Sequence, residues 1–85
     1  MDYVLTEHAR AEMLRRRILQ KWVEATMASP EQIVDGYGGR MVYQSRFQDG
    51  DKTYLIRLIV EFRGETPVIV TLYRTSKIQK YWRYP

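Results

Sequence analysis

The chain contains one histidine, His8, which lies in the first turn of an expected helix. Glu12 follows four residues later, and Arg15 and Arg16 follow at seven and eight, so these side chains share one stripe of the helix. One imidazole cannot form the two-histidine acid–base pair that many metal-independent ribonucleases use. His8 is interpreted either as a single acid–base group or as a half-buried histidine bonded to Glu12 or to a strand carbonyl.

Arg57 is the second residue that could take part in chemistry, because it interrupts an apolar run between Leu55 and Ile59. An arginine on a mostly apolar strand face needs a partner, and the candidates are Glu61, a helix acid or a bound phosphate. An arginine that binds phosphate could stabilise the charge that develops on the phosphorus oxygens during RNA cleavage. The ion pair and the phosphate site are both retained as interpretations.

The C-terminal stretch between residues 74 and 83 carries four cations and no acid. In a short helix, Lys77, Lys80 and Tyr81 would lie three and four residues apart and share one face beside the sheet. That face could contact RNA, or the two lysines could simply be solvated. Tyr81 and Trp82 could stack on bases, or a Tyr–Trp pair could close a small core.

Composition excludes several classes of site. The chain has no cysteine, which excludes disulfides, thiolate zinc sites, iron–sulfur clusters and cysteine nucleophiles. Its ten acidic residues are scattered singly, so neither a metal site built from converging carboxylates nor any other cofactor is expected. Residues 1–39 hold five basic and six acidic side chains (net −1), and residues 40–85 hold nine and four (net +5). This asymmetry suits a polyanionic partner, although a basic balance is also common in small soluble domains.

The length of 85 residues predicts one domain that spans residues 1–85. The longest apolar stretch, residues 55–60, contains an arginine, so no segment is expected to span a bilayer. The N-terminus has an early acid and no apolar signal segment. We therefore expect a cytoplasmic protein without a membrane partner.

Local signals predict three helices. Thr6 is expected to cap the first helix, because its hydroxyl can accept a backbone N–H of the first turn. A second helix is expected to end at Ser29, because Pro30 disfavours the helical conformation in the residue before it. A short C-terminal helix is expected to begin after Thr75 or Ser76, with one of these hydroxyls as its cap.

Alternating apolar residues predict strands over residues 40–48, 53–62 and 67–74, joined by two hairpins. A short strand at residues 3–5 would add an edge. The predicted fold class is α+β, with two N-terminal helices packed on a three- to four-stranded antiparallel meander and a short C-terminal helix.

The chain carries four ordered motifs: H-A-x-x-x-M-x-x-R-x-I at 8–18, P-E-Q-I-V at 30–34, G-R-M-V-Y-Q-S-R-F at 39–47 and T-S-K-x-x-K-Y-W at 75–82. Together they resemble a small bacterial family of unknown-function domains akin to the BrnT branch of the RelE/ParE-like toxin superfamily. The resemblance implies a RelE-like fold. It also implies the toxin of a type II toxin–antitoxin pair, a metal-independent endoribonuclease that a small acidic antitoxin protein inhibits.

The expected substrate is RNA, including ribosome-associated mRNA, and no small-molecule cofactor is expected. The scissile phosphate would lie between Arg57 and Lys77, while His8 or Tyr81 assists the 2′-hydroxyl or the leaving 5′-oxygen. The residues assigned to RNA binding are Arg16, Tyr43, Thr75, Ser76 and Lys80. The alternative functions are a basic nucleic-acid-binding module without catalysis and a protein-interaction module.

The chain departs from the family pattern at two positions of the first motif. Glu12 stands where the family commonly has arginine, so an anion replaces a cation that could face phosphate. Arg17 stands where the family commonly has glycine. If this position ends the first helix in a left-handed conformation, arginine costs about 1 kcal/mol there.

Overall fold

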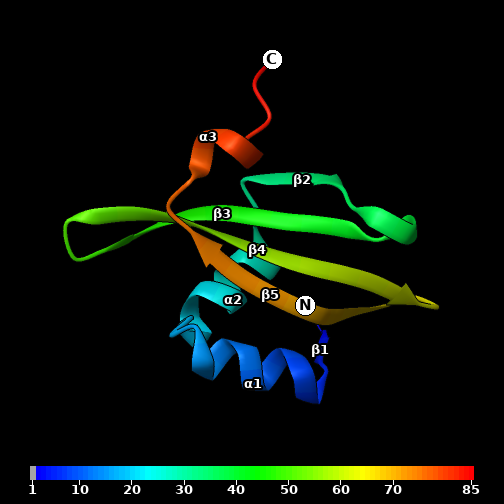
Figure 1. Ribbon diagram of the computed structural model, residues 1–85. Helices are drawn as coiled ribbons and strands as arrows, with labels where there is room; N and C mark the ends of the chain where they lie inside the picture. Colours follow the sequence, from blue (N-terminus) through cyan, green and yellow to red (C-terminus); the bar gives the residue numbers. More distant parts are fainter. Residues whose placement is uncertain (1) are drawn as a thin grey trace.

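The chain forms a mixed sheet with two helices on one face and a short third helix on the other (Figure 1). The computed structural model describes residues 2–85. The strands follow the order β1-β5-β4-β3-β2 across the sheet. The elements are β1 (Val4–Leu5), α1 (Glu7–Arg15), α2 (Gln20–Ala28), β2 (Gln32–Asp35), the 3-10 turn Tyr37–Gly39, β3 (Met41–Asp49), β4 (Lys52–Arg63), β5 (Thr66–Thr75) and α3 (Ile78–Tyr81).

The α+β class is confirmed, and so are the antiparallel meander of β3, β4 and β5 and the short edge strand β1. Two details of the predicted sheet are corrected. The sheet has five strands, because β2 forms between α2 and β3, and it is mixed, because β1 runs parallel to β5. The strand β2 escaped prediction because it has four residues, of which only Val34 is buried.

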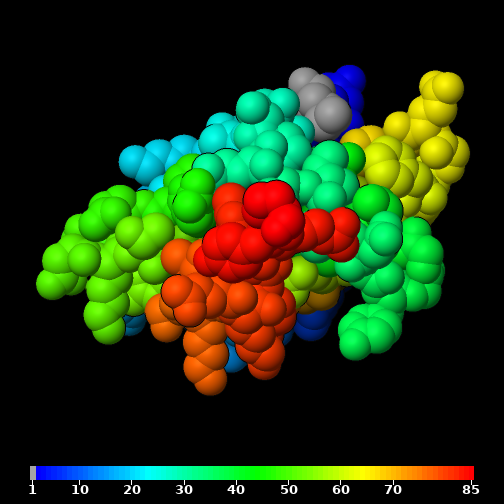
Figure 2. All heavy atoms as spheres, turned by 90° about the horizontal axis from the view of Figure 1, so that it is seen from above, coloured from blue at the N-terminus to red at the C-terminus, as the bar shows by residue number. Residues whose placement is uncertain are grey.

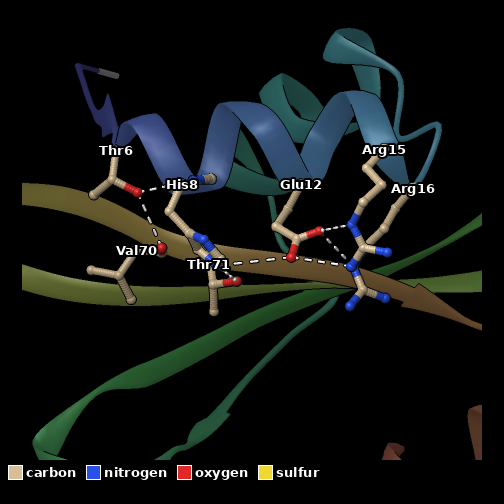
Figure 3. A network of polar contacts seen from close by, with 8 residues as sticks. Thr6, His8, Glu12, Arg15, Arg16, Val70 and Thr71 are labelled. Carbon is tan, nitrogen blue, oxygen red and sulfur yellow. Dashed lines mark hydrogen bonds and ion pairs between the residues drawn. The ribbon is translucent and has the colours of Figure 1, made fainter.

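Thr6 caps α1 as predicted and also fixes the helix to the sheet. Its side-chain oxygen accepts a hydrogen bond from the Ala9 N–H at 3.0 Å. The same hydroxyl donates to the Val70 carbonyl in β5 at 3.1 Å, while the Thr6 N–H donates to the Ile69 carbonyl at 3.1 Å. Figure 3 shows the Thr6 side chain between the start of α1 and β5. One threonine therefore sets both where α1 begins and where it lies on the sheet.

The end of α1 has the left-handed residue that glycine usually supplies. Arg17 has φ 55°, and it is the one non-glycine residue with positive φ among residues 2–85. The Ile18 N–H donates to the Met13 carbonyl at 2.9 Å and the Arg17 N–H to the Leu14 carbonyl at 3.2 Å. This is the hydrogen-bond pattern of a Schellman motif, in which Ile18 turns back into the core.

The core lies between α1, α2 and one face of the sheet. Ile56, Leu58 and Val60 of β4 are fully buried and pack against α2 residues that include Val23 and Met27. Tyr43 of β3 belongs to this core and is 7% exposed. The opposite face of the sheet carries the side chains that alternate with these, and α3 lies over it (Figure 1).

The start of α3 differs from its prediction. Lys77 occupies the N-cap position, and its side chain makes no capping hydrogen bond. The Thr75 hydroxyl does accept a backbone N–H, but the donor is that of Lys77, at 3.0 Å. The threonine therefore shapes the turn that precedes the helix and leaves the helix itself uncapped.

We predict that Arg17→Gly stabilises the protein by about 1 kcal/mol, because glycine removes the Cβ contact that a left-handed residue suffers. The Arg17 carbonyl, which accepts a hydrogen bond from Arg74 at 3.0 Å, is retained in this variant. For a domain of this size the melting temperature should rise by about 4–8 °C. Arg10→Gly in the exposed interior of α1 is the matched control and should cost about 0.5–1 kcal/mol. A lower melting temperature for Arg17→Gly than for the wild type would contradict this prediction.

Candidate functional site

Four polar side chains form a row across the sheet face opposite the core. Each of them pairs with the next across the sheet: Gln32 of β2 with Gln44 of β3, Gln44 with Arg57 of β4, and Arg57 with Tyr73 of β5. The Gln44 side-chain N–H donates to the Gln32 side-chain oxygen at 2.8 Å, and Arg57 Nε donates to the Gln44 oxygen at 2.8 Å. Arg57 Nη1 donates to the Tyr73 hydroxyl. The row therefore joins four of the five strands through their side chains.

Arg57 has no anionic partner among the residues that the structure describes, since no carboxylate oxygen lies within 4.0 Å of its guanidinium. Glu61, the partner considered from sequence, instead pairs with Arg40 at 3.4 Å and with Arg63 at 3.1 Å. Of the partners considered from sequence, the ion pair with Glu61 is therefore wrong. A half-buried arginine whose hydrogen-bond partners are all neutral keeps its positive charge available for an anion.

Two aromatic rings enclose the Arg57 guanidinium. Its central carbon lies 4.3 Å from the centroid of the Tyr81 ring and 5.7 Å from that of Tyr73. The two rings meet edge to face, with centroids 6.0 Å apart. Cation–π contacts of this kind hold an arginine in place without neutralising its charge.

The environments of these two phenols push their pKa values apart. The pKa of Tyr81 is lowered from its ordinary value, first by the neighbouring Lys80 ammonium and then by the Tyr73 hydroxyl, both of which favour the phenolate. The pKa of Tyr73 is raised, because burial disfavours its phenolate more than the hydrogen bond from Arg57 favours it. A pair of neighbouring groups with divergent pKa values can divide the roles of base and acid.

The C-terminal segment, residues 76–85, lies on this polar row. The Gln44 side-chain N–H donates to the Tyr81 carbonyl at 3.2 Å. The Gln32 side chain donates to the Arg83 carbonyl at 2.8 Å and accepts from the Arg83 N–H at 3.1 Å. Figure 2 shows the segment, in orange and red, across the middle of this face between the β3–β4 hairpin and the turn after β2. These contacts set Tyr81 over Arg57.

The structure brings together Arg57, Tyr81 and Lys80 from the set predicted from sequence. The Lys80 ammonium lies 5.2 Å from the Tyr81 ring centroid. Lys77 is exposed at the start of α3, and Ser76 beside it is also exposed. These residues therefore border the polar row without entering it.

His8 lies on α1 and Arg16 is the C-cap residue of that helix, which covers the other face of the sheet (Figures 1 and 3). The His8 ring nitrogen bonds to the Thr71 hydroxyl at 3.2 Å and lies 4.0 Å from a Glu12 oxygen. Glu12 accepts from Arg15 Nε at 2.7 Å and from Arg16 Nε at 3.3 Å, and the Arg15 hydrogen bond is the main reason that the pKa of Glu12 is lowered. Glu12 therefore partly neutralises the positive charges of Arg15 and Arg16. His8 contacts neither Arg57 nor Tyr81.

Tyr43 does not share the face of Arg57. Its register partner in β4 is Leu58, and both side chains are buried in the core. A ring that is 7% exposed leaves no surface on which a base could stack. The expected role of Tyr43 in RNA binding therefore finds no support in its position, and Gln44, the next residue, takes its place on the polar face.

We predict that Gln44→Leu lowers the free energy of unfolding by about 2–4 kcal/mol. The fully buried amide is the partner of Arg57 Nε, of the Gln32 side chain and of the Tyr81 carbonyl, and leucine leaves all of them unpaired. Denaturant unfolding measures the loss, and faster digestion by carboxypeptidase would report release of the C-terminal segment. Gln48→Leu, at an exposed position of the same strand, should change stability by less than about 0.5 kcal/mol. Equal stability of the two variants would contradict the prediction.

Comparisons with known proteins identify a family of unknown function. The family model described as a domain of unknown function, DUF4258, matches residues 5–74. No curated protein matches the chain, and no solved structure matches it. Within residues 2–85, no helix is long and apolar enough to cross a membrane. The matched segment runs from Leu5 in β1 to Arg74 in β5 and covers most of the chain. The chain therefore belongs to the DUF4258 family.

Proposed function

We propose that this protein is the toxin of a type II toxin–antitoxin pair, related to the BrnT branch of the RelE-like toxins, and that it cleaves RNA without a metal ion. The observation that carries the proposal is Arg57, a half-buried arginine with no carboxylate partner among residues 2–85, beside a tyrosine of lowered pKa. A small acidic antitoxin would bind the basic face around α3. RNA as substrate implies that the protein acts in the cytoplasm.

In the proposed reaction the ribose 2′-hydroxyl attacks the adjacent phosphorus. The Tyr81 phenolate accepts the proton of that hydroxyl, and its lowered pKa favours this role. Arg57 stabilises the negative charge that develops on the phosphorus oxygens. As the new O–P bond forms, the P–O5′ bond breaks, and the leaving oxygen takes its proton from Tyr73, whose raised pKa keeps it protonated. The products are a 2′,3′-cyclic phosphate and a 5′-hydroxyl.

Lys77, at the N-cap position of α3, and Lys80, in its last turn, have supporting roles in this proposal. Lys77 would hold a phosphate that flanks the cleaved one, and Lys80 would act by lowering the pKa of Tyr81. His8 receives no catalytic role, because α1 and α3 lie on opposite faces of the sheet (Figure 1).

We predict that the purified protein, free of antitoxin, cuts RNA in the presence of a chelator. Arg57→Lys should lower the rate about 10²- to 10³-fold, because an ammonium cannot reproduce the fork of donors that stabilises the phosphorane charge. Tyr81→Phe should lower it about 10²- to 10⁴-fold through loss of the general base. Both rates are measured on a labelled RNA, alone and with ribosomes, after circular dichroism has verified folding.

His8→Ala is the control for this series and should retain full activity, since His8 is exposed and lies on the other side of the sheet. Intact RNA under both conditions would sink the cleavage proposal. If the protein binds RNA in a salt-dependent manner and no product forms, it is a nucleic-acid-binding module instead.

We predict that Lys80→Ala moves the pH–rate profile to higher pH. The neighbouring Lys80 ammonium is the largest cause of the lowered pKa of Tyr81, so its removal raises that pKa. The reactive phenolate then forms only at higher pH, and the rise of rate with pH shifts in the same direction. Lys77→Ala, an equal loss of charge, should reduce affinity for RNA and leave the profile where it is. An unshifted profile in Lys80→Ala would remove Tyr81 from the role of base.

A further inference from the structure

A hollow of about 340 Å³ opens on the polar face beside Arg57. Its floor is apolar, because Val42 of β3 pairs with Ile59 of β4 two residues along from the polar row, and residues two apart in a strand share a face. Tyr73 lines the hollow from β5, and the turn after β2 lines the opposite side. The turn comes close at Gly36, where a Cβ would lie 3.3 Å from a methyl of Val42. The volume lies at the lower end of the range for small-molecule sites.

Arginines line this hollow toward both ends of the apolar floor. Arg57 lies at one end, and Arg40, which follows the turn, lies toward the other. The Arg40 guanidinium is bound to Glu61 of β4 at 3.4 Å. Glu61 follows Arg57 by four residues in the same strand, so these two positions are about 13 Å apart with Ile59 midway between them. A molecule that fits this pattern has an apolar or aromatic middle and a negative charge at each end.

Asp35 is the acidic residue beside this hollow, and its side chain is directed to the other face of the sheet. It pairs with Met41, which pairs with Val60, and both of these partners pack in the core. Asp35 therefore borders the hollow without adding a negative charge to its floor.

The carboxylate of Glu61 serves two arginines and leaves a positive charge over. It accepts from Arg40 at 3.4 Å and from Arg63 at 3.1 Å, so it balances one of their two charges. Hydrogen bonds to the chain use Nε and Nη2 of Arg40 and Nε and Nη1 of Arg57, so each guanidinium keeps further N–H donors. Both arginines can therefore bind an anion in the hollow.

Lys77 continues the row of cations beyond Arg57. The strand β5 ends at Thr75, which pairs with Leu55 of β4, and Lys77 follows two residues later. Arg40, Arg57 and Lys77 therefore succeed one another along the direction of β4, on the side of the sheet that carries α3 (Figure 1). A series of cations along one line suits the regularly spaced phosphates of a single RNA strand.

We propose that this hollow binds one internal nucleotide of the RNA, the one that precedes the cleaved bond. Its 3′-phosphate lies on Arg57, its 5′-phosphate on Arg40, and its nucleoside part over Val42 and Ile59. The inference rests on the proposed function, since the 3′-phosphate is the phosphate that is cleaved. Arg40 is then a positioning residue that takes no part in the chemistry. Because an apolar floor can contact any base, the subsite selects for the 5′-phosphate and not for one base.

The test measures calorimetric binding of adenosine 3′,5′-bisphosphate, adenosine 3′-monophosphate and inorganic phosphate at low salt. Wild type should bind the bisphosphate about tenfold more tightly than the monophosphate, because a second charge-assisted contact forms, and inorganic phosphate most weakly. Arg40→Gln should remove the preference for the bisphosphate and leave binding of the monophosphate unchanged. Arg40→Lys should retain part of the preference, since the charge remains.

Arg63→Gln is the matched control for Arg40→Gln. It removes the same charge and a contact with the same Glu61 carboxylate, but Arg63 does not line the hollow. This variant should keep the preference for the bisphosphate. Glu61→Gln removes the anion that competes with the 5′-phosphate for Arg40, and it should strengthen binding of the bisphosphate more than that of the monophosphate.

The outcomes separate this inference from the proposed function. Equal affinity of the wild type for the bisphosphate and the monophosphate, or an equal loss in Arg40→Gln and Arg63→Gln, would overturn the subsite even if RNA is cleaved. Conversely, a preference for the bisphosphate that depends on Arg40 would support the subsite even if no RNA is cut, and only the cleavage proposal would then fail.

Discussion

The amide of Gln44 is the interaction on which the polar face depends. It is fully buried, and its three hydrogen bonds reach Arg57 in β4, Gln32 in β2 and the Tyr81 carbonyl in the C-terminal segment. A buried amide that loses partners costs free energy, so the row favours one register of the strands over any slipped one. Because Gln44 donates twice and accepts once, it can join an edge strand, a cation and the C-terminal segment at a single position.

The half-buried arginines of the chain differ in what neutralises them. Arg74 on β5 binds Asp49 at 2.7 Å, and Arg16 at the C-cap of α1 binds Glu12 at 3.3 Å, so each has a carboxylate. Arg57 and Arg74 each lie over two aromatic rings, but Arg57 has amide and phenol oxygens where Arg74 has a carboxylate. Neutral partners orient a guanidinium and reduce the cost of its burial without cancelling its charge. The distribution of carboxylates therefore distinguishes a cation that stabilises the fold from one that is suited to a ligand.

The sequence predicted correctly those elements that neighbouring residues begin or end. Thr6 begins α1, Pro30 follows the end of α2, and the hairpin at Gly50 lies where an Asp-Gly pair accepts positive φ. The strand β2 was missed because one buried residue in four gives no periodic signal. Arg57 could be found because it interrupts an apolar strand, but Gln44 could not. A glutamine that alternates with core residues looks solvent-exposed until the C-terminal segment, 37 residues away, is known to cover it. The placement of Tyr43 failed by one position, which in a strand reverses the face.

The C-terminal segment is attached to the sheet through backbone groups, whereas its proposed chemistry depends on its side chains. Gln44 and Gln32 bind backbone groups of Tyr81 and Arg83, and backbone groups are present whatever the side chains are. The family match ends at residue 74, so it includes the whole row that holds the segment and excludes the segment itself. The side chain of Tyr81 is consequently free to vary without loss of the docking contacts. The sheet thus provides a fixed cation, together with two amide donors and one acceptor for the C-terminal segment, and residues 76–85 decide which group is set over that cation.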